Sequence, residues 1–211
     1  MLTPNLGDEI MFESRLREYD LLFTTLALIP FNTRRLFDAG CANGKWLDIC
    51  CRRWGALENN CFGNDKRTNV WIDWHRTNPN TQITFIPKPT VELEPMVSAF
   101  DIVHQSMMLS SIVDPEVRAR TAHVLWGLLR PGGFLVSYDF WLNPFNPRTT
   151  GIGLSELKRL FPSARRIYTR RVTLAPPLCR KLAILGERVV LNLEAARVMN
   201  THFLTALRRP E

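Results

Sequence analysis

The sequence predicts an α/β fold built on a doubly wound, parallel sheet. Short apolar runs typical of strands alternate with helical patterns through most of the chain. Residues 35–47 combine an apolar run, a turn containing Gly40 and Gly44, and the start of a helix. A proline and two glycines at 131–133 end a second helical pattern and lead into another apolar run. Strands joined through helices in this way are expected to lie parallel.

The first half of the chain supplies four of the expected strands. Residues 8–28 predict an amphipathic helix, and residues 35–38 predict the first strand. The helix expected at 46–54 carries apolar residues at helical spacing and is followed by Gly55, a natural helix cap. A second strand at 60–64 ends beside Asp65. A helix at 67–77 and strands at 82–86 and 100–104 follow.

The second half begins with the clearest helix start. Asp114 is typical of an N-cap, and Pro115 of the first helical position. An apolar stripe then runs to residue 129, and a fifth strand is expected at 134–138. Beyond it we expect a short helix at 155–160 and strands at 167–174 and 202–207. Between residues 178 and 200 the pattern does not separate helix from loop.

Length and composition favour one soluble globular domain. The 211 residues are 45% hydrophobic and 22% charged. We divide the domain into a helical segment at 1–33, a ligand-binding core at 34–140 and a carboxyl-terminal part at 141–211. No secretory signal is apparent, and the apolar run at 21–31 is too short to cross a bilayer. Five cysteines without a C-x-x-C pair suggest neither disulfides nor a metal site, so a cytoplasmic location is expected.

The positive charge is concentrated at the carboxyl-terminal end. Of the net charge of +7, residues 151–211 carry +8 and residues 1–150 carry −1. Such a region can attract an anionic small molecule, a nucleic acid or an anionic membrane surface, although charge runs more often only keep a face solvated. The basic residues are scattered and no aromatic-rich motif accompanies them, so a nucleic-acid partner is not expected. Peripheral membrane contact stays open.

The turn after the first expected strand is the main candidate site. Ligands of open α/β sheets bind at the carboxyl ends of the strands, where Asp38 and the glycine turn lie. The turn does not match the phosphate-binding pattern G-x-G-x-x-G, because Ala42 replaces the second glycine. A second acid, Asp65, ends the next strand, where a carboxylate can accept hydrogen bonds from ribose hydroxyls. The pattern therefore favours a nucleoside ligand without a pyrophosphate.

Residues 34–140 resemble the class I S-adenosylmethionine-dependent methyltransferases. The match consists of the turn at 38–44, Asp65, the strand F-D-I-V-H-Q-S at 100–106 and the string L-R-P-G-G at 129–133. The resemblance implies a Rossmann-like, mostly parallel, seven-stranded sheet with an antiparallel last strand, and S-adenosyl-L-methionine as cofactor. Segments at 143–147, 173–177 and 201–204 further resemble a small bacterial subgroup associated with polysaccharide or secondary-metabolite assembly.

The resemblance implies which residues contact the cofactor. They are the acid and turn at the first strand, the acid after the second and a side chain at the end of the fourth: Asp38, Gly40, Cys41, Ala42, Asn43, Gly44, Asp65 and Gln105. Many members also carry an acid after the third strand that binds the adenine amine. Here that stretch includes Lys88 and two prolines, so the contacts to adenine must come from the backbone or from elsewhere.

Methyl transfer to a hydroxyl requires positioning and a base that removes the proton. Asp139 ends the fifth strand and is the first candidate base, and His104 on the fourth strand is the second. Tyr138, Asn143 and His202 are candidates for the acceptor pocket. Each has a structural alternative. Asp139 could simply cap the following loop, and His104 could be a buried histidine with satisfied hydrogen bonds.

The sequence thus predicts an enzyme that methylates a small molecule, such as a sugar or secondary metabolite. A hydroxyl is favoured over an amine, and an anionic group on the acceptor would suit the basic end. One alternative is an NAD(P)-dependent oxidoreductase on the same sheet, which the missing third glycine disfavours. Another is a basic module that binds RNA or a membrane surface without catalysis, for which salt-sensitive binding would be expected.

Overall fold

The computed structural model describes residues 5–93, 99–142, 146 and 148–211. The helices are α1 (Leu6–Thr25), α2 (Lys45–Trp54), α3 (Thr68–Thr77), α4 (Met108–Ser111), α5 (Pro115–Leu128), α6 (Leu154–Leu160), α7 (Pro176–Leu182) and α8 (Glu187–Ala196). The strands are β1 (Leu36–Ala39), β2 (Cys61–Asn64), β3 (Thr84–Ile86), β4 (Phe100–Ser106), β5 (Leu129–Phe140), β6 (Arg165–Leu174) and β7 (Asn200–Arg208).

The strands form one seven-stranded sheet in the order β3-β2-β1-β4-β5-β7-β6. Strands β1 to β5 pair in parallel, and β7 runs antiparallel to both β5 and β6. The chain leaves β1 toward β2 and β3, then returns to place β4 on the other side of β1. This reversal creates a switch point between β1 and β4, where ligands of such sheets bind. The expected doubly wound sheet with an antiparallel last strand is confirmed.

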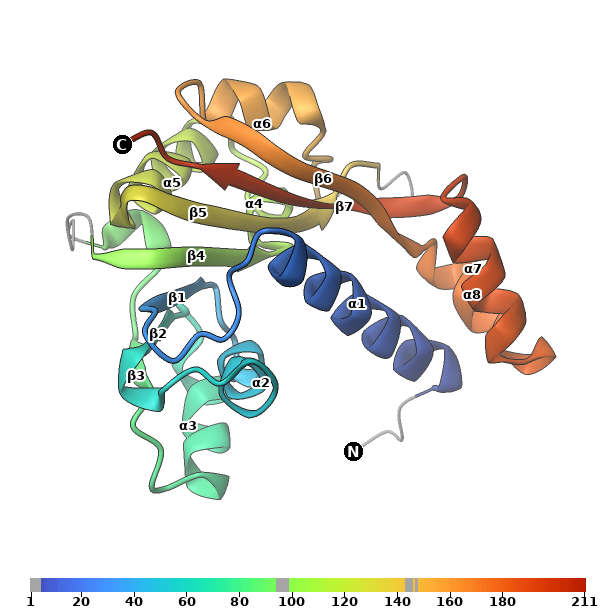
Figure 1. Ribbon diagram of the computed structural model, residues 1–211, viewed down its shortest axis with the longest axis horizontal. Coiled ribbons are helices and arrows are strands. Elements are labelled where there is room, and N and C mark those ends of the chain that lie inside the picture. The colour runs from blue at the N-terminus through green and yellow to red at the C-terminus, as the bar shows by residue number, and fades with distance from the viewer. Residues whose placement is uncertain (1–4, 94–98, 143–145, 147) are drawn as a thin grey trace.

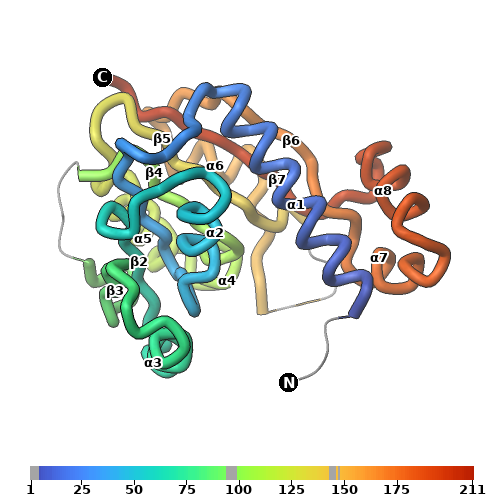
Figure 2. Tube along the Cα trace, turned by 60° about the horizontal axis from the view of Figure 1, so that its bottom comes forward, coloured from blue at the N-terminus to red at the C-terminus, as the bar shows by residue number. Residues whose placement is uncertain are grey.

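Helices cover both faces of the sheet (Figures 1 and 2), and alternation along the strands divides the buried side chains between two layers. Leu36, Ile102 and Val136 face the layer of α1 and α2, whereas their neighbours Phe37 and Leu135 face α5 and α6. This is the period of two expected for strands buried on both faces. Helix α1 runs across the first face, where Tyr19, Leu22 and Phe23 are buried. Its position decides how the site is covered.

Local signals in the sequence explain where several helices begin and end. The Asp114 carboxylate accepts hydrogen bonds from the backbone N–H groups of Glu116 and Val117, at 2.8 and 3.2 Å, and so caps α5. Gly55 closes α2 with φ at +73°, a left-handed conformation that favours glycine. Both features match the expectation from sequence.

Two segments go beyond the sequence prediction. The ambiguous stretch after residue 178 forms α7 and α8, which lie past the ends of β6 and β7 (Figure 1). Strand β5 begins at Leu129, five residues before the expected start, with an irregular register against β4 between Phe100 and Ile102. The proline and glycines at 131–133 therefore lie within the strand at this irregularity, rather than in a separate turn.

The described residues hold no cluster of histidine, cysteine or acidic side chains that could bind a metal ion. All five cysteines carry free thiols. None of the described helices combines the length and apolar character that a bilayer span requires.

Candidate functional site

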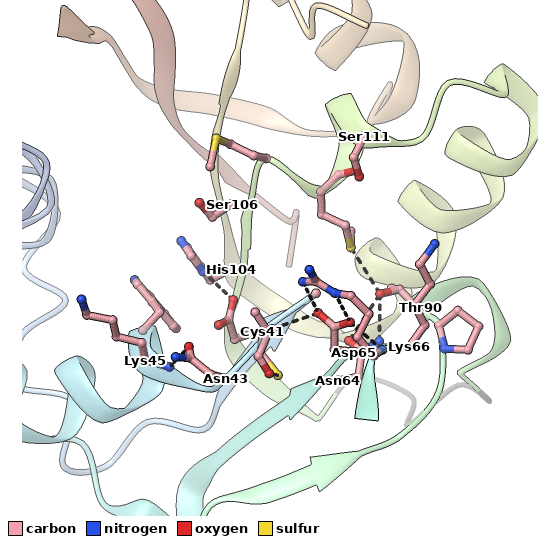
Figure 3. A pocket seen from close by; sticks show the side chains of 18 of the residues that line it. Cys41, Asn43, Lys45, Asn64, Asp65, Lys66, Thr90, His104, Ser106 and Ser111 are labelled. Atoms are coloured by element: carbon pink, nitrogen blue, oxygen red, sulfur yellow. Dashed lines mark hydrogen bonds and ion pairs between the residues drawn. The ribbon is translucent and has the colours of Figure 1, made fainter. Parts of the chain in front are cut away.

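A cavity of about 800 Å³ opens at the carboxyl ends of β1, β2 and β4. Its walls come from the loop after β1, the end of β2, the segment at 89–91 and one face of α1. Figure 3 shows His104 and Ser106 from β4 in one part of this cavity, and Asp65 and Thr90 in another. The cavity lies at the switch point of the sheet, as the sequence predicted for a ligand site.

The loop after β1 turns sharply beneath the cavity. Gly40 and Gly44 have φ of +68° and +73°, and Ala42 between them also has a positive φ of +48°. A Cβ on Gly40 would lie 3.1 Å from the side chain of Met108, so glycine is favoured there by space as well as by conformation. Gly40, Cys41, Ala42 and Asn43 line the cavity. Gly44 is not among the described residues that line the cavity. It directly precedes α2, and the ring of Trp71 packs against it.

Asp65 faces the cavity and fastens the loop to β2. One carboxylate oxygen accepts a hydrogen bond from the backbone N–H of Ala42 at 2.9 Å. The carboxylate also accepts from the backbone and guanidinium of Arg67. Burial by itself would raise the pKa of Asp65, but the hydrogen bonds from Arg67 and Ala42 outweigh it and hold the pKa below its usual value. The group is therefore an ionised acceptor of hydrogen bonds.

Asp38 and His104 form a buried pair on the floor of the cavity. They are register partners on the adjacent parallel strands β1 and β4, so their side chains project side by side from the same face. His104 Nδ1 lies 2.7 Å from Asp38 Oδ1. Burial raises the pKa of Asp38, and the opposing influence of His104 only partly offsets it. The buried carboxylate of Asp38 requires a hydrogen-bond donor, and its contact with His104 Nδ1 fixes the orientation of the imidazole ring.

Tyr19 of α1 completes a chain of three hydrogen-bonding side chains. Its hydroxyl lies 2.7 Å from His104 Nε2, on the side of the ring opposite Asp38. The indole of Trp46 stacks on the imidazole with ring centroids 3.8 Å apart and planes 5° apart. Tyr19, His104, Asp38 and Trp46 all line the cavity. Both imidazole nitrogens of His104 are therefore engaged, Nδ1 by Asp38 and Nε2 by Tyr19.

The structure corrects the expected positions of Asp139 and Gln105. Both are buried, and neither is among the described residues that line the cavity. They belong to the strand positions that face α4, because Asp139 shares its side of β5 with Leu135 and Ser137. The Asp139 carboxylate accepts hydrogen bonds from the backbone of Ser110 and the amide of Gln105, at 3.1 and 3.2 Å. In this structure Asp139 therefore supports α4, whereas His104 is the candidate base that lines the cavity.

Tyr138 and His202 are also displaced from the expected acceptor pocket. The Tyr138 hydroxyl forms a hydrogen bond of 2.8 Å with the hydroxyl of Thr173. The rings of Tyr138 and His202 stack with their centroids 4.7 Å apart. Neither residue belongs to the described lining of the cavity. Burial and the nearby Arg15 lower the pKa of His202 to about 3, so it remains neutral. Asn143 lies outside the described residues.

The residues that sequence reasoning missed come mainly from α1. Phe12, Arg15, Leu16 and Tyr19 share one face and line the cavity. Their spacing of three, four and seven residues predicts that they share one face of the helix. The spacing does not indicate whether that face packs in the core or contacts a ligand. Trp46 was expected only as part of the apolar stripe of α2. Its stacking on His104 depends on a contact between residues far apart in the chain.

The family comparison decides the class of protein. A model of the methyltransferase domain matches residues 11–179 of the 211. The chain belongs to the methyltransferase domain family. This match confirms the S-adenosylmethionine-dependent methyltransferase expected from sequence and disfavours the alternative of a dinucleotide oxidoreductase. A search of curated proteins finds no match.

Solved structures show the same fold for this methyltransferase. The 1,6-didemethyltoxoflavin-N1-methyltransferase of Burkholderia thailandensis, bound to 1,6-didemethyltoxoflavin and S-adenosylhomocysteine, matches with a TM-score of 0.63 and 17% identity, over 91% of this chain and 76% of that one. An S-adenosylmethionine-dependent methyltransferase of Mesorhizobium loti matches with a TM-score of 0.66 and 15% identity, over 91% and 97%. The N-methyltransferase NodS of Bradyrhizobium japonicum matches with 0.64 and 14%, over 93% and 96%.

Proposed function

We propose that this methyltransferase transfers a methyl group to a hydroxyl of a small molecule, with Tyr19, His104 and Asp38 removing the proton. The main support for this proposal is the continuous chain of hydrogen bonds beside the cavity. The Tyr19 hydroxyl lies 2.7 Å from His104 Nε2, and His104 Nδ1 lies 2.7 Å from Asp38 Oδ1. Such a chain suits a hydroxyl acceptor because an alcohol must lose its proton as the new bond to carbon forms. An amine acceptor is the second candidate, since NodS is an N-methyltransferase of the same fold.

The cavity has the features that S-adenosylmethionine requires. Asp65 offers a carboxylate to the ribose hydroxyls, although Arg67 occupies it in this structure through a guanidinium that is 58% exposed. An ion pair with so exposed a partner is weak, so a ligand can displace it at low cost. The absent Cβ of Gly40 leaves room along the cavity. Pro89, Thr90 and Val91 form a further wall of the cavity, against which the base of the nucleoside can pack.

The residues of the chain divide the work between binding and proton removal. The cofactor, when bound, supplies an electrophilic methyl group on a sulfonium. Asp65 and the loop at 40–43 hold the nucleoside and amino-acid parts in place. The acceptor proton passes to the Tyr19 hydroxyl, whose own proton passes to His104 Nε2, and Asp38 stabilises the resulting imidazolium through Nδ1–H. Burial raises the pKa of Tyr19 well above its usual value, which keeps the phenol protonated between turnovers.

The remaining parts of the proposal concern the setting of the enzyme. We place it in the cytoplasm, in the biosynthesis of a sugar derivative or secondary metabolite, supported by its five free thiols. We also propose that the acceptor carries an anionic group. Peripheral contact with an anionic membrane is a second role that we propose for the basic residues of 151–211.

The substitution Tyr19→Phe tests the proton path. It keeps the aromatic packing against Phe23 and Trp54 but removes the hydroxyl. Once an acceptor has been found by a mass-shift screen of hydroxylated and amino compounds, we expect kcat to fall by about 10²-fold or more. Affinity for S-adenosylhomocysteine should change little.

Tyr168→Phe is the matched control, because it also removes a buried hydroxyl, one that has no hydrogen-bond partner among the described residues. It lies on β6 outside the described lining of the cavity, so kcat should be unchanged. A Tyr19→Phe enzyme with normal kcat would reject the path through Tyr19. Exclusive methylation of amines in the screen would reject the hydroxyl acceptor.

A further inference from the structure

Arg15 places a positive charge inside the cavity, close to the proposed proton path. It lies four residues before Tyr19 on α1, so the two side chains occupy the same helix face on adjacent turns. Its guanidinium carbon lies 5.4 Å from the ring centre of Phe12 and 5.1 Å from that of Tyr138. The side chain is half-buried between these rings. The packing fixes the guanidinium toward the acceptor end of the cavity.

This charge has no acidic partner in the part of the chain that the structure describes. Arg17, two residues further along the same helix, pairs with Glu187, and Arg170 and Arg197 both pair with Glu18. No such ion pair involves Arg15. A half-buried arginine without a counter-ion loses hydration that aromatic contacts only partly replace. The guanidinium therefore keeps donors available for an anion.

A second cation, Lys45, also lies close to the ring of Phe12. Lys45 Nζ lies 4.0 Å from the centre of that ring, and Lys45 also lines the cavity. Arg15 and Tyr19 both line the cavity, and the positive charge of Arg15 lowers the pKa of Tyr19 against the larger raising effect of burial. Two cations that both contact Phe12 thus line the cavity together with Tyr19.

From this arrangement we infer that the methyl acceptor carries a carboxylate or phosphate group, which Arg15 binds while the hydroxyl lies at Tyr19. The inference rests on the proposed function. Guanidinium donors match the paired oxygens of either anion. The two side chains leave the same face of α1 one helical turn apart, so a single small molecule can contact both. Uncharged sugars and simple alcohols would then be poor substrates.

Matched probes test the inference without knowledge of the natural acceptor. Calorimetry measures how 3-hydroxybenzoate, 3-hydroxyphenyl phosphate and the uncharged 3-hydroxybenzamide bind to the protein loaded with S-adenosylhomocysteine. We expect at least one anionic probe to bind about tenfold more tightly than the amide. The stronger of the two anions identifies the group. Equal binding of all three probes, or binding of none, would overturn the inference.

Substitutions assign the preference to Arg15. Arg15→Met keeps an apolar stem against Phe12 but removes the charge, and it should abolish the preference for the anion. Arg15→Lys should restore it in part. Arg17→Met removes an equal charge from an exposed position outside the cavity, so the preference should persist. If Arg15→Met retains the preference, or both Met variants lose it alike, the anion is not bound by Arg15.

The loading step separates failure of this inference from failure of the proposed function. If S-adenosylhomocysteine binds but the probes show no preference for charge, only the anionic acceptor is rejected. If S-adenosylhomocysteine itself does not bind, the methyltransferase site is rejected, and the inference falls with it. Circular dichroism confirms that each variant is folded, and the comparison of probes on the unaltered protein holds without any variant.

Discussion

Asp139 and His104 illustrate how a single strand position separates a structural residue from a candidate catalytic one. Both are buried and both occupy the ends of central strands. His104 shares a face with Leu36 and Ile102, beneath α1, and reaches the cavity. Asp139 lies on the opposite face, where its carboxylate accepts hydrogen bonds from three donors, the backbone N–H groups of Ser110 and Phe140 and the amide of Gln105. Its role is to hold α4 against the sheet.

Asp139 should make the stability of the fold depend on pH. Burial raises its pKa to about 6, against the lowering effect of the hydrogen bonds it accepts. The folded chain therefore binds this proton more tightly than the unfolded chain. The resulting stabilisation is fully present below about pH 4 and is lost as the pH rises through about 6. Between pH 4 and 7, the unfolding free energy of the natural protein should fall by about 2–3 kcal/mol relative to Asp139→Asn.

Urea unfolding at a series of pH values measures this difference. Any constant offset caused by the lost hydrogen bonds of the Asn variant does not affect the slope. Parallel stability curves for the two proteins would show that Asp139 is ionised at every pH tested, which would contradict the assigned shift.

The residue-level site was only partly predictable from sequence. Asp38, Asp65 and the turn at 40–43 follow from their position at the ends of strands, and they line the cavity. His104 was expected, but its partner Tyr19 lies 85 residues away and could not be inferred without the packing of α1. The misplacement of Gln105 and Asp139 has one cause. Alternation tells which residues share a face, but a strand buried on both sides does not reveal which face meets the ligand.

Helices carry their own boundary signals to different degrees, which explains where the element predictions succeed. α5 has an acidic cap, a proline at its first position and a continuous apolar stripe. α7 and α8 bury few side chains: Cys179 in the first, Val190 and Glu194 in the second. Helices that contribute so little to the core lack the apolar periodicity on which sequence prediction depends. The ambiguity at residues 178–200 follows from that weak packing.

Asp114→Ala should remove the cap of α5. Two backbone N–H groups would lose their acceptor, and loss of an N-cap costs about 1 kcal/mol. For a chain of this length, we expect the midpoint of thermal unfolding to fall by about 2–4 °C. Asp73→Ala is the control. It removes an exposed acid that pairs only with Arg76, and its effect should be within the error of calorimetry. A midpoint unchanged by Asp114→Ala would mean that water replaces the cap.

At the scale of the whole molecule, the topology brings the functional groups together. The reversal between β1 and β4 sets Asp38 beside His104, and the antiparallel pair β6–β7 extends the face on which α1 lies. α1 then contributes both Tyr19 and Arg15 to the cavity. The alternation of strands and helices predicted this sheet, because a parallel sheet requires crossovers. The placement of an amino-terminal helix over the site required long-range contacts that no local pattern records.

The central claim is that this cavity binds the cofactor through Asp65, and titration calorimetry with S-adenosylhomocysteine tests it most directly. We expect the natural protein to bind one equivalent and Asp65→Ala to bind about 5- to 150-fold more weakly, from the 1–3 kcal/mol cost of unpaired hydrogen-bonding groups. Arg67→Ala, which removes only the exposed partner of Asp65, should bind at least as tightly as the natural protein. NADH should not bind. Absence of S-adenosylhomocysteine binding, or equal affinity in the natural protein and Asp65→Ala, would contradict the account.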